Sequence, residues 1–580
     1  MIKHTLDTSL EKENEYKEKS YKFFFNKFVK SQLHIIIILL ALNIVSISFS
    51  FINPLLTKWL IDDVFIDKNI NLFFYIIIGF FGMYFLSAAS NYFSNYLTGK
   101  LELVMLKNVS ESALNYIQRA SIKNTHELKV GDLITRIIGN AQMAINIPVH
   151  IIPQIIISTI SIVVPFIIMV YLNLQLALIV MSPILLFILS SLFFGKRMEK
   201  TQMTFLEENA SVYSFLKEKL SIVPLIKVFG LEKWSQDKFN EKMDGYYNSS
   251  IKYTKASSLN ISIGTLILGV PIILIMIFGS PMVIDGSLSL GTFTAFMSYV
   301  SIFFSPISTL SELWTSYKSS LPAFDRIKEL FELQQDYSGN ESLAIKKCEI
   351  EFNNVWFSYG NNKFLLKRFN AIFRKGLNYI VGDNGAGKST ILKLLCSLYS
   401  PDKGNIKIDG QNLLKVKKDD LVNNIAMIFS EPYLFDDSIY ENIQIGNLSA
   451  SKNEIINAAK LVNIHEFVKS LPDEYETQVG ESGINLSSGE KQKIALARAI
   501  LKNSPIILLD EVTKSIDTES KETINKVINE LKNNKTIIII THNANEIEPD
   551  SNIVYLGHKN HRKELISVVN NKEKVILDFN

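Results

Sequence analysis

The chain has 580 residues, with 60 lysines and arginines against 57 aspartates and glutamates and a formal net charge of +3. Its length leaves room for two or more domains, and the near balance of charge gives no reason to expect a nucleic-acid partner. Two cysteines are too few for a disulfide framework and argue against a cysteine metal site, which favours a reducing compartment.

The N-terminal tail, residues 1–30, mixes charges and is rich in lysine. We expect it to be a solvated cytosolic segment rather than a targeting sequence, because no cleavable signal precedes the first apolar run. Hydrophobic residues make up 47% of the chain, with 37 phenylalanines, and they are concentrated before residue 320. This share is high for a soluble enzyme.

Six apolar runs precede residue 320, each near the ~20 residues that a bilayer-spanning helix requires. They lie at 34–60, 72–97, 147–172, 174–195, 257–280 and 291–314. Buried helices of a soluble protein are the alternative, but so many long runs favour a transmembrane domain, which we place at 31–325.

The connections between the runs differ in charge. The short connections 61–71 and 281–290 are nearly free of lysine and arginine, whereas 98–144 and 196–256 are rich in both. The positive-inside rule therefore predicts a cytosolic N-terminus, two long cytosolic connections and a cytosolic C-terminal half.

The long cytosolic connections have helical apolar spacing at 100–120 and 205–255, so we expect the membrane helices to extend into the cytosol. Short transverse helices at the bends, 121–127 and 228–234, would rest on a cytosolic ATPase domain. Ordinary solvated charged loops are the alternative.

Charged side chains are scarce within the runs, which argues against ion coupling. His150 is expected to be a helix-packing residue, because it has no ionisable neighbour in the sequence. Polar side chains that remain would line a cavity for an amphipathic or apolar solute, although packing explains each of them as well: Asn43, Asn53, Asn91, Asn95, Asn260 and Ser298.

Helical periodicity is expected to fade from about 321, and we place a linker at 326–347. After it, strands and helices alternate, which predicts an α/β domain at 348–580. Within this domain, residues 382–390 fit G-x-x-x-x-G-K-[ST] between a predicted strand and a predicted helix. A glycine-rich turn is the alternative to a phosphate-binding loop.

The chemistry of such a loop assigns a role to each residue. Glycines let backbone N–H groups wrap the phosphates, a lysine supplies positive charge, and a hydroxyl reaches Mg²⁺. The corresponding residues are Gly382, Asn384, Gly385, Gly387, Lys388, Ser389 and Thr390. The sequence therefore predicts ATP and Mg²⁺ as cofactors.

Further nucleotide-site residues are predicted on both sides of the loop. Tyr359 could stack on adenine, with a core strand aromatic as the alternative. Asp510 ends a buried strand, where its carboxylate would join Ser389 in holding Mg²⁺. Glu511 would orient or deprotonate the attacking water, and His542, after another buried strand, would contact the γ-phosphate.

Residues 486–490, Leu-Ser-Ser-Gly-Glu, resemble the signature sequence of ABC-type ATPases, with Ser488 in place of a usual glycine and Glu490 in place of glutamine. Three segments of the first half, 130–136, 226–230 and 323–327, resemble those of six-helix ABC exporters. The chain thus looks like an exporter-type half-transporter of the ABC transporter superfamily.

That resemblance implies a dimer, identical or mixed, in which the phosphate loop of one chain faces Ser487 and Gly489 of the other. It implies that Asp517 communicates across the dimer, and that ATP-driven closure moves the membrane helices. One residue departs from the pattern: Ser430 stands where the family has a glutamine that reaches Mg²⁺ and the attacking water. We therefore expect ATP binding more firmly than fast hydrolysis.

Taken together, the sequence predicts a membrane α-helical bundle of six transmembrane helices followed by an α/β P-loop NTPase domain. The expected function is ATP-driven export of an amphipathic or hydrophobic solute, foremost a peptide, across a bacterial cytoplasmic membrane. A lipid flippase, a multidrug efflux pump and a regulatory membrane ATPase without a transported solute are the alternatives. Membrane lipids and the transported molecule are the expected partners besides the second half-transporter.

Overall fold

The computed structural model describes residues 19–125, 130–336, 339–360, 364–480, 483, 485–514, 516–543, 546–549 and 551–556. The predictions for residues 1–18 and for the transverse helix at 126–127 lie outside them. The described residues form two compact units. The first contains the helices before Tyr116 and those from Val130 to Glu332. The second contains the short segment that begins at Tyr116 and ends before Val130, together with the residues from Leu333 onward.

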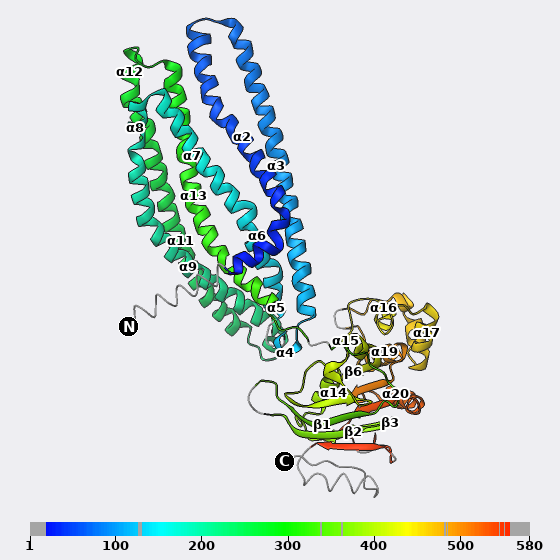
Figure 1. Ribbon diagram of the computed structural model, residues 1–580. Helices are drawn as coiled ribbons and strands as arrows, with labels where there is room; N and C mark the ends of the chain where they lie inside the picture. Colours follow the sequence, from blue (N-terminus) through cyan, green and yellow to red (C-terminus); the bar gives the residue numbers. More distant parts are fainter. Residues whose placement is uncertain are drawn as a thin grey trace. The chain divides into compact units, whose positions relative to one another are not determined.

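The first unit is helical (Figure 1). Several of its long helices continue through π-helical or 3₁₀ turns. In chain order the elements are η1 (Phe25–Val29), η2 (Lys30–Gln32), α2 (Leu33–Trp59), η3 (Leu60–Ile66), α3 (Ile70–Gln118), α5 (Val130–Ile134), η4 (Thr135–Asn140), α6 (Ala141–Asn146), η5 (Ile147–Ile151), α7 (Ile152–Leu172), α8 (Leu174–Met181), α9 (Pro183–Ser221), α10 (Val223–Val228), α11 (Glu232–Leu274), η6 (Ile275–Gly279), α12 (Ser280–Ile284) and α13 (Leu290–Phe331).

Within the described residues, five continuous helical segments are long and apolar enough to cross a membrane: Lys19–Ile66, Ile70–Gln118, Val130–Leu172, Glu232–Ile284 and Leu290–Phe331. They contain five of the six predicted runs. The remaining run, 174–195, is divided between α8 and α9 at Ser182. The extension of helices beyond the apolar runs is confirmed for α3, α9 and α11.

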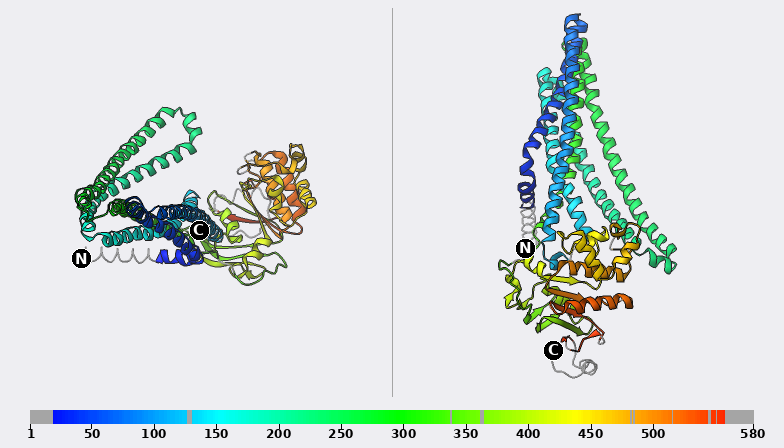
Figure 2. Two further views of the ribbon diagram at one scale, coloured as in Figure 1. Left: turned by 90° about the horizontal axis from the view of Figure 1, so that it is seen from above. Right: turned by 90° about the vertical axis from the view of Figure 1, so that its right-hand side faces the viewer.

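The α9–α11 hairpin lies apart from the other helices of its unit in the view from above (Figure 2). Aromatic contacts hold its two arms together: the Phe205 ring is 5.4 Å from that of Tyr246 and 5.6 Å from that of Tyr253. The short helix at its tip is α10, Val223–Val228, so the predicted position at 228–234 is wrong. Pro224 lies in the first turn of this helix, and Gly230, with φ 62°, lies in the turn after it.

Two further expectations for this unit need correction. Helical structure continues through α13 to Phe331, so periodicity does not fade at 321. His150 does have an ionisable neighbour, because its Nε2 lies 3.5 Å from the Glu102 carboxylate on α3. Residues that are 48 positions apart in the sequence meet here, which a search for neighbours along the chain cannot detect.

The second unit contains two sheets. The antiparallel sheet has the order β2-β1-β4-β5, and the parallel sheet has the order β6-β7-β8-β3-β9. The strands are β1 (Ile350–Phe357), β2 (Leu366–Phe373), β3 (Gly376–Gly382), β4 (Lys403–Ile408), β5 (Gln411–Asn412), β6 (Ile425–Ile428), β7 (Ile506–Asp510), β8 (Thr536–Ile540) and β9 (Asn552–Leu556).

The second unit also contains helices (Figure 1). They are α4 (Ile122–Thr125), α14 (Lys388–Leu395), η7 (Leu413–Lys415), α15 (Lys418–Asn424), α16 (Ile439–Gln444), α17 (Lys452–Leu461), α18 (His465–Ser470), η8 (Glu474–Glu476), α19 (Ser488–Lys502) and α20 (Thr518–Leu531). Alternate residues of β7 contribute to two apolar cores: Ile506 and Leu508 pack with α14 and the antiparallel sheet, and Ile507 and Leu509 pack with α16–α20. Both faces of the parallel sheet are therefore buried, as its continuous apolar strands predict.

Candidate functional site

The site residues gather at one edge of the parallel sheet. Strands β7, β8 and β3 are neighbours and run in the same direction, so their carboxyl ends meet at that edge. The phosphate loop follows β3, Glu511 follows β7, and Thr541 with His542 follows β8. The topology thereby assembles segments that are more than a hundred residues apart.

The loop between β3 and α14 depends on its glycines. Gly382, Gly385 and Gly387 have φ angles of 150°, 78° and 97°, a region that favours glycine. A Cβ on Gly382 would lie 1.8 Å from the Leu556 carbonyl oxygen. Asn384 lies within this loop, whose course matches the strand–loop–helix predicted for phosphate binding.

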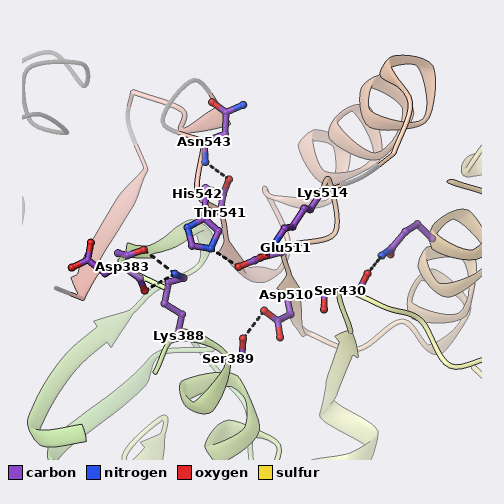
Figure 3. Close-up of polar contacts among 12 residues, drawn as sticks. Asp383, Lys388, Ser389, Ser430, Asp510, Glu511, Lys514, Thr541, His542 and Asn543 are labelled. Atoms are coloured by element: carbon purple, nitrogen blue, oxygen red, sulfur yellow. Dashed lines mark hydrogen bonds and ion pairs between the residues drawn. The ribbon is translucent and has the colours of Figure 1, made fainter. Parts of the chain in front are cut away.

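Lys388 starts α14 and is almost fully buried. Its ammonium donates hydrogen bonds to the carbonyl oxygens of Gly382 (2.8 Å) and Asp383 (3.0 Å) (Figure 3). An ammonium has three N–H donors, so one remains for a phosphate oxygen. Burial lowers the pKa of Lys388, against the opposing influence of Glu511 and other carboxylates.

Ser389 and Asp510 lie together, as the predicted Mg²⁺ site requires. The Ser389 hydroxyl donates to Asp510 Oδ1 at 2.9 Å. Burial raises the pKa of Asp510, although the bond from Ser389 opposes this. A hydroxyl beside a buried carboxylate is a hard oxygen donor set that fits Mg²⁺, and the cation would favour the ionised carboxylate.

Glu511 is held from two sides (Figure 3). Its Oε1 lies 2.5 Å from His542 Nε2, and its Oε2 accepts a hydrogen bond from Lys514 Nζ at 2.8 Å. Burial would raise the pKa of Glu511, but the Lys514 and His542 contacts outweigh it and hold the pKa below its usual value. The backbone of Glu511 is left-handed, with φ 51°, which is strained for a residue with a side chain.

A partly buried network beside this pair was not predicted from the sequence. Glu546 accepts hydrogen bonds from Thr541 (2.7 Å) and Thr513 (3.1 Å) and forms an ion pair with Lys521 (2.6 Å). It therefore joins the segment that contains Glu511 to the segment that contains His542. The only sequence signal is an acidic residue four positions after His542, which is too common to identify such a role.

Tyr359 lies near the phosphate loop through its hydroxyl, which is 2.9 Å from Thr390 Oγ1 on α14. Its ring is perpendicular to those of Phe357 and Tyr399, and 44% of the residue is exposed. A half-exposed ring beside the loop fits the predicted stacking on adenine, and the perpendicular contacts fix its orientation.

Ser430 follows β6 and is exposed. Its carbonyl oxygen accepts a hydrogen bond of 2.7 Å from Gln492 Nε2 of α19, and Phe429 O accepts from the same nitrogen at 3.3 Å. Gln492 is buried, and its Oε1 has no hydrogen-bond partner among the described residues. A side chain of α19 thus fixes the backbone of the segment in which the usual glutamine is replaced.

Ser487, Gly489 and Asp517 form a second cluster around the first turn of α19. Ser487 caps α19 in a capping box with Glu490. Asp517 caps α20 by accepting from Ser520 N at 2.8 Å, and hydrogen bonds from the Ser520 side chain and from its backbone N–H lower the pKa of Asp517. A Cβ on Gly489 would lie 2.8 Å from both Asp517 Oδ2 and Ser520 Oγ, so a side chain at this position would displace these two polar groups. The roles of these residues across a dimer remain predictions.

Comparisons with known proteins agree with this geometry. The family described as ABC transporter transmembrane region matches residues 36–307, and the family described as ABC transporter matches residues 367–514. A proposed multidrug export ATP-binding/permease protein of Bacillus subtilis (strain 168), YgaD, is 29% identical over 92% of this chain and 94% of its own length. A similarly named protein of Staphylococcus aureus (strain NCTC 8325 / PS 47) is 28% identical over the same shares.

The fold is also that of a solved structure. A bacterial Atm1-family ABC exporter with ATP bound superposes with a TM-score of 0.77 at 21% identity, over 94% of this chain and 99% of that one. The predicted architecture, a helical membrane domain followed by an α/β nucleotide-binding domain, is confirmed.

Proposed function

The chain belongs to the ABC transporter superfamily as an exporter-type half-transporter, and from this premise we propose that it exports an amphipathic or hydrophobic solute, foremost a peptide, across the bacterial cytoplasmic membrane. It is a multi-pass membrane protein that binds ATP and couples ATP hydrolysis to transport. The kind of solute, the identity of the membrane and the requirement for Mg²⁺ are part of what we propose.

The contact between Glu511 and His542 is the observation that carries the proposed catalytic mechanism. Lys388 would place its remaining N–H on a terminal phosphate oxygen, and Ser389 with Asp510 would hold Mg²⁺, which offsets phosphate charge. Glu511 would then accept a hydrogen bond or proton from the attacking water. His542 would hold that carboxylate in place through Nε2, which lies 2.5 Å from Glu511 Oε1, and its other ring nitrogen, Nδ1, would donate to the γ-phosphate.

A second half-transporter is part of the proposal. Ser487 and Gly489 form a cluster of their own around α19, which supports a role on the nucleotide of a partner chain. An anion would be favoured at the N-terminus of this 15-residue helix. Closure of two chains on ATP would complete both sites, with Asp517 at the junction.

The names of relatives favour a second candidate for the solute. YgaD and the Staphylococcus aureus protein are both named for multidrug export, so a multidrug efflux pump stands beside the peptide exporter. ATPase stimulation by peptides, by cationic drugs and by lipids would separate these two candidates from a lipid flippase. ATP-dependent uptake into inside-out vesicles would separate all three from a membrane ATPase that transports nothing.

Replacement of Glu511 by Gln tests the hydrolytic mechanism. We expect the variant to bind MgATP normally and to lose at least about 100-fold in hydrolysis rate, because it lacks the carboxylate that activates water. Retention of labelled ATP after rapid gel filtration would measure the trapped state. A variant that hydrolyses at the normal rate would contradict the assigned role.

A further inference from the structure

A polar cavity of about 370 Å³ lies in the helical unit, between α2, α3, η5 and α7. Its polar lining includes Asn43 of α2, Asn95, Thr98 and Glu102 of α3, His150 of η5 and Gln154 of α7. The predicted topology places these positions at or near the cytosolic ends of three membrane spans. A solute would meet this cavity from the cytosol or from the inner leaflet.

The charge of the cavity comes from Glu102. The lining contains no lysine or arginine among the residues that the structure describes. Gln142 Nε2 approaches Glu102 Oε1 at 3.4 Å, and His150 Nε2 approaches Glu102 Oε2 at 3.5 Å. Both approaches are long for hydrogen bonds, so the carboxylate retains capacity for a closer donor.

The walls of the cavity are held by bonds between and within helices. Asn43 Nδ2 donates to Leu39 O at 2.8 Å, which fixes its amide on α2. Ser90 Oγ donates to Leu42 O and Ser46 Oγ donates to Asn91 Oδ1, both at 2.8 Å, so α2 and α3 are joined beside the cavity. A preformed wall reduces the ordering cost of binding.

The cavity also has an apolar side. Val149, Pro153 and Ile157 line it, and all three are buried. Its volume is at the lower end of the ~300–1,000 Å³ typical of ligand sites, so it would hold one head group or side chain of a larger solute.

We propose that this cavity is a recognition subsite for a cationic, hydrogen-bonding group, an ammonium or guanidinium, of the amphipathic solute. The inference rests on the proposed export function and adds a charge requirement to it. Glu102 pairs with the cation, the amides of Asn43, Asn95 and Gln154 accept its remaining hydrogens, and the apolar side receives the adjoining hydrocarbon. The entering cation replaces His150 Nε2, which lies 3.5 Å from Glu102 Oε2, as the partner of that carboxylate.

Binding to the full-length protein in lipid nanodiscs tests the subsite without relying on turnover. The probes are two nonapeptides with a neutral nitrobenzoxadiazole label, identical except that one contains lysine where the other contains norleucine. Fluorescence anisotropy gives the dissociation constants. We expect the lysine peptide to bind about tenfold more tightly, since hydrogen bonds to charged groups exceed neutral ones in strength.

Three variants test whether the preference for the lysine peptide depends on the charge of Glu102. Glu102→Gln retains shape and an acceptor but lacks the charge, and should reduce the ratio of the two dissociation constants to about one. Glu111→Gln, on the exposed face of the same helix and 64% exposed, should retain the wild-type ratio and the basal ATPase rate. His150→Gln should also retain the preference, because the carboxylate is intact.

Equal binding of the two peptides by the wild-type protein would overturn the proposal. A preference that survives Glu102→Gln, or that disappears equally in His150→Gln, would overturn it as well. ATP-dependent uptake is measured separately in inside-out vesicles, so absence of uptake contradicts export while the dissociation constants still decide the subsite.

Discussion

At the scale of single residues, Glu511 combines a strained backbone with two polar contacts. A left-handed conformation for a residue other than glycine costs on the order of 1–3 kcal/mol, and such strain is common where a side chain must be aimed. Lys514 and His542 together determine that aim. The side chain that does the proposed chemistry is thus restrained by contacts within the protein.

Lys514→Ala tests whether the lysine tunes Glu511. Lys514 lowers the pKa of Glu511, so its removal should raise that pKa. The carboxylate must be ionised to act as a base, so the acidic limb of the pH–rate profile for ATP hydrolysis should shift to higher pH. Because Lys514 is largely exposed, we expect the shift to be small and to decrease with added salt.

Lys469→Ala is the matched control, because Lys469 of α18 forms an exposed ion pair with Glu474 of η8, remote in sequence from the phosphate loop. It should leave the acidic limb where it is. If the acidic limb of the pH–rate profile is unchanged in Lys514→Ala, the lysine does not influence the Glu511 carboxylate.

Ser430→Gln is the second prediction at this scale. The backbone of Ser430 is already fixed by Gln492, and its side chain is exposed, so a longer side chain can be accommodated. Glutamine would reach toward Mg²⁺ and the attacking water, and basal ATPase activity should rise severalfold. Ser430→Ala should leave the rate unchanged, and the same result for Ser430→Gln would mean that this position is not limiting.

At the scale of elements, α4 lies in the segment predicted to form a transverse helix, and it packs on the core of the ATPase domain. Ile122 packs against the core formed by α14 and the antiparallel sheet. The flanking backbone is bonded as well: Ser121 N donates to Gln334 O at 2.8 Å, and Asp336 N donates to Arg119 O at 2.9 Å. This segment is therefore built into the second unit, although it lies in the sequence between membrane helices.

Ile122→Ala should weaken that packing by about 1–2 kcal/mol, less than the ~2–5 kcal/mol for a fully buried isoleucine. We expect basal ATP hydrolysis to persist while solute-stimulated hydrolysis and vesicle uptake fall together. Lys123→Ala, on the exposed side of the same helix, should leave both unchanged. Normal stimulation in Ile122→Ala would exclude α4 as the transmitting element.

The strands and helices also show which elements a sequence pattern can place correctly. The strands before Lys388 and at Asp510 are short, mostly apolar runs with motif residues at their ends, so both strand and site residue could be predicted locally. The α10 helix was misplaced, because its apolar residues continue through Phe229 and Leu231 into the turn. Pro224 was the informative residue there, and apolar spacing alone could not identify the start of the helix.

At the scale of the whole molecule, the predictable parts were those encoded in short segments. The phosphate loop, the Asp510–Glu511 pair and His542 each belong to such a segment, and strand order brings them together. Glu546 with Lys521, and Glu102 with His150, could not be predicted, because each pair depends on the packing of separate elements. The sequence contains the residues but no spacing that links them.

The proposed dimer leads to a cross-linking prediction. In a protein with Asn384→Cys and Ser487→Cys, MgATP should produce a disulfide-linked dimer under mild oxidation, because the loop of one chain would face the α19 N-terminus of the other. The native thiols give little background, since Cys348 is buried and Cys396 partly so. Either single variant serves as control. No ATP-dependent dimer would favour a different partner chain or contradict the arrangement.

Asp62 has a consequence for movement within the membrane domain. Its carboxylate accepts from Gly291 N at 2.8 Å and from Ser289 Oγ at 2.6 Å, so η3 is fastened to the start of α13. A Cβ on Gly291 would lie 2.5 Å from Lys58 O, so the two backbones are in direct contact there. The first and last of the five apolar segments are thus bonded to each other at the ends that the predicted topology places outside the membrane. An opening toward the exterior would therefore form between other helices, while these two move together.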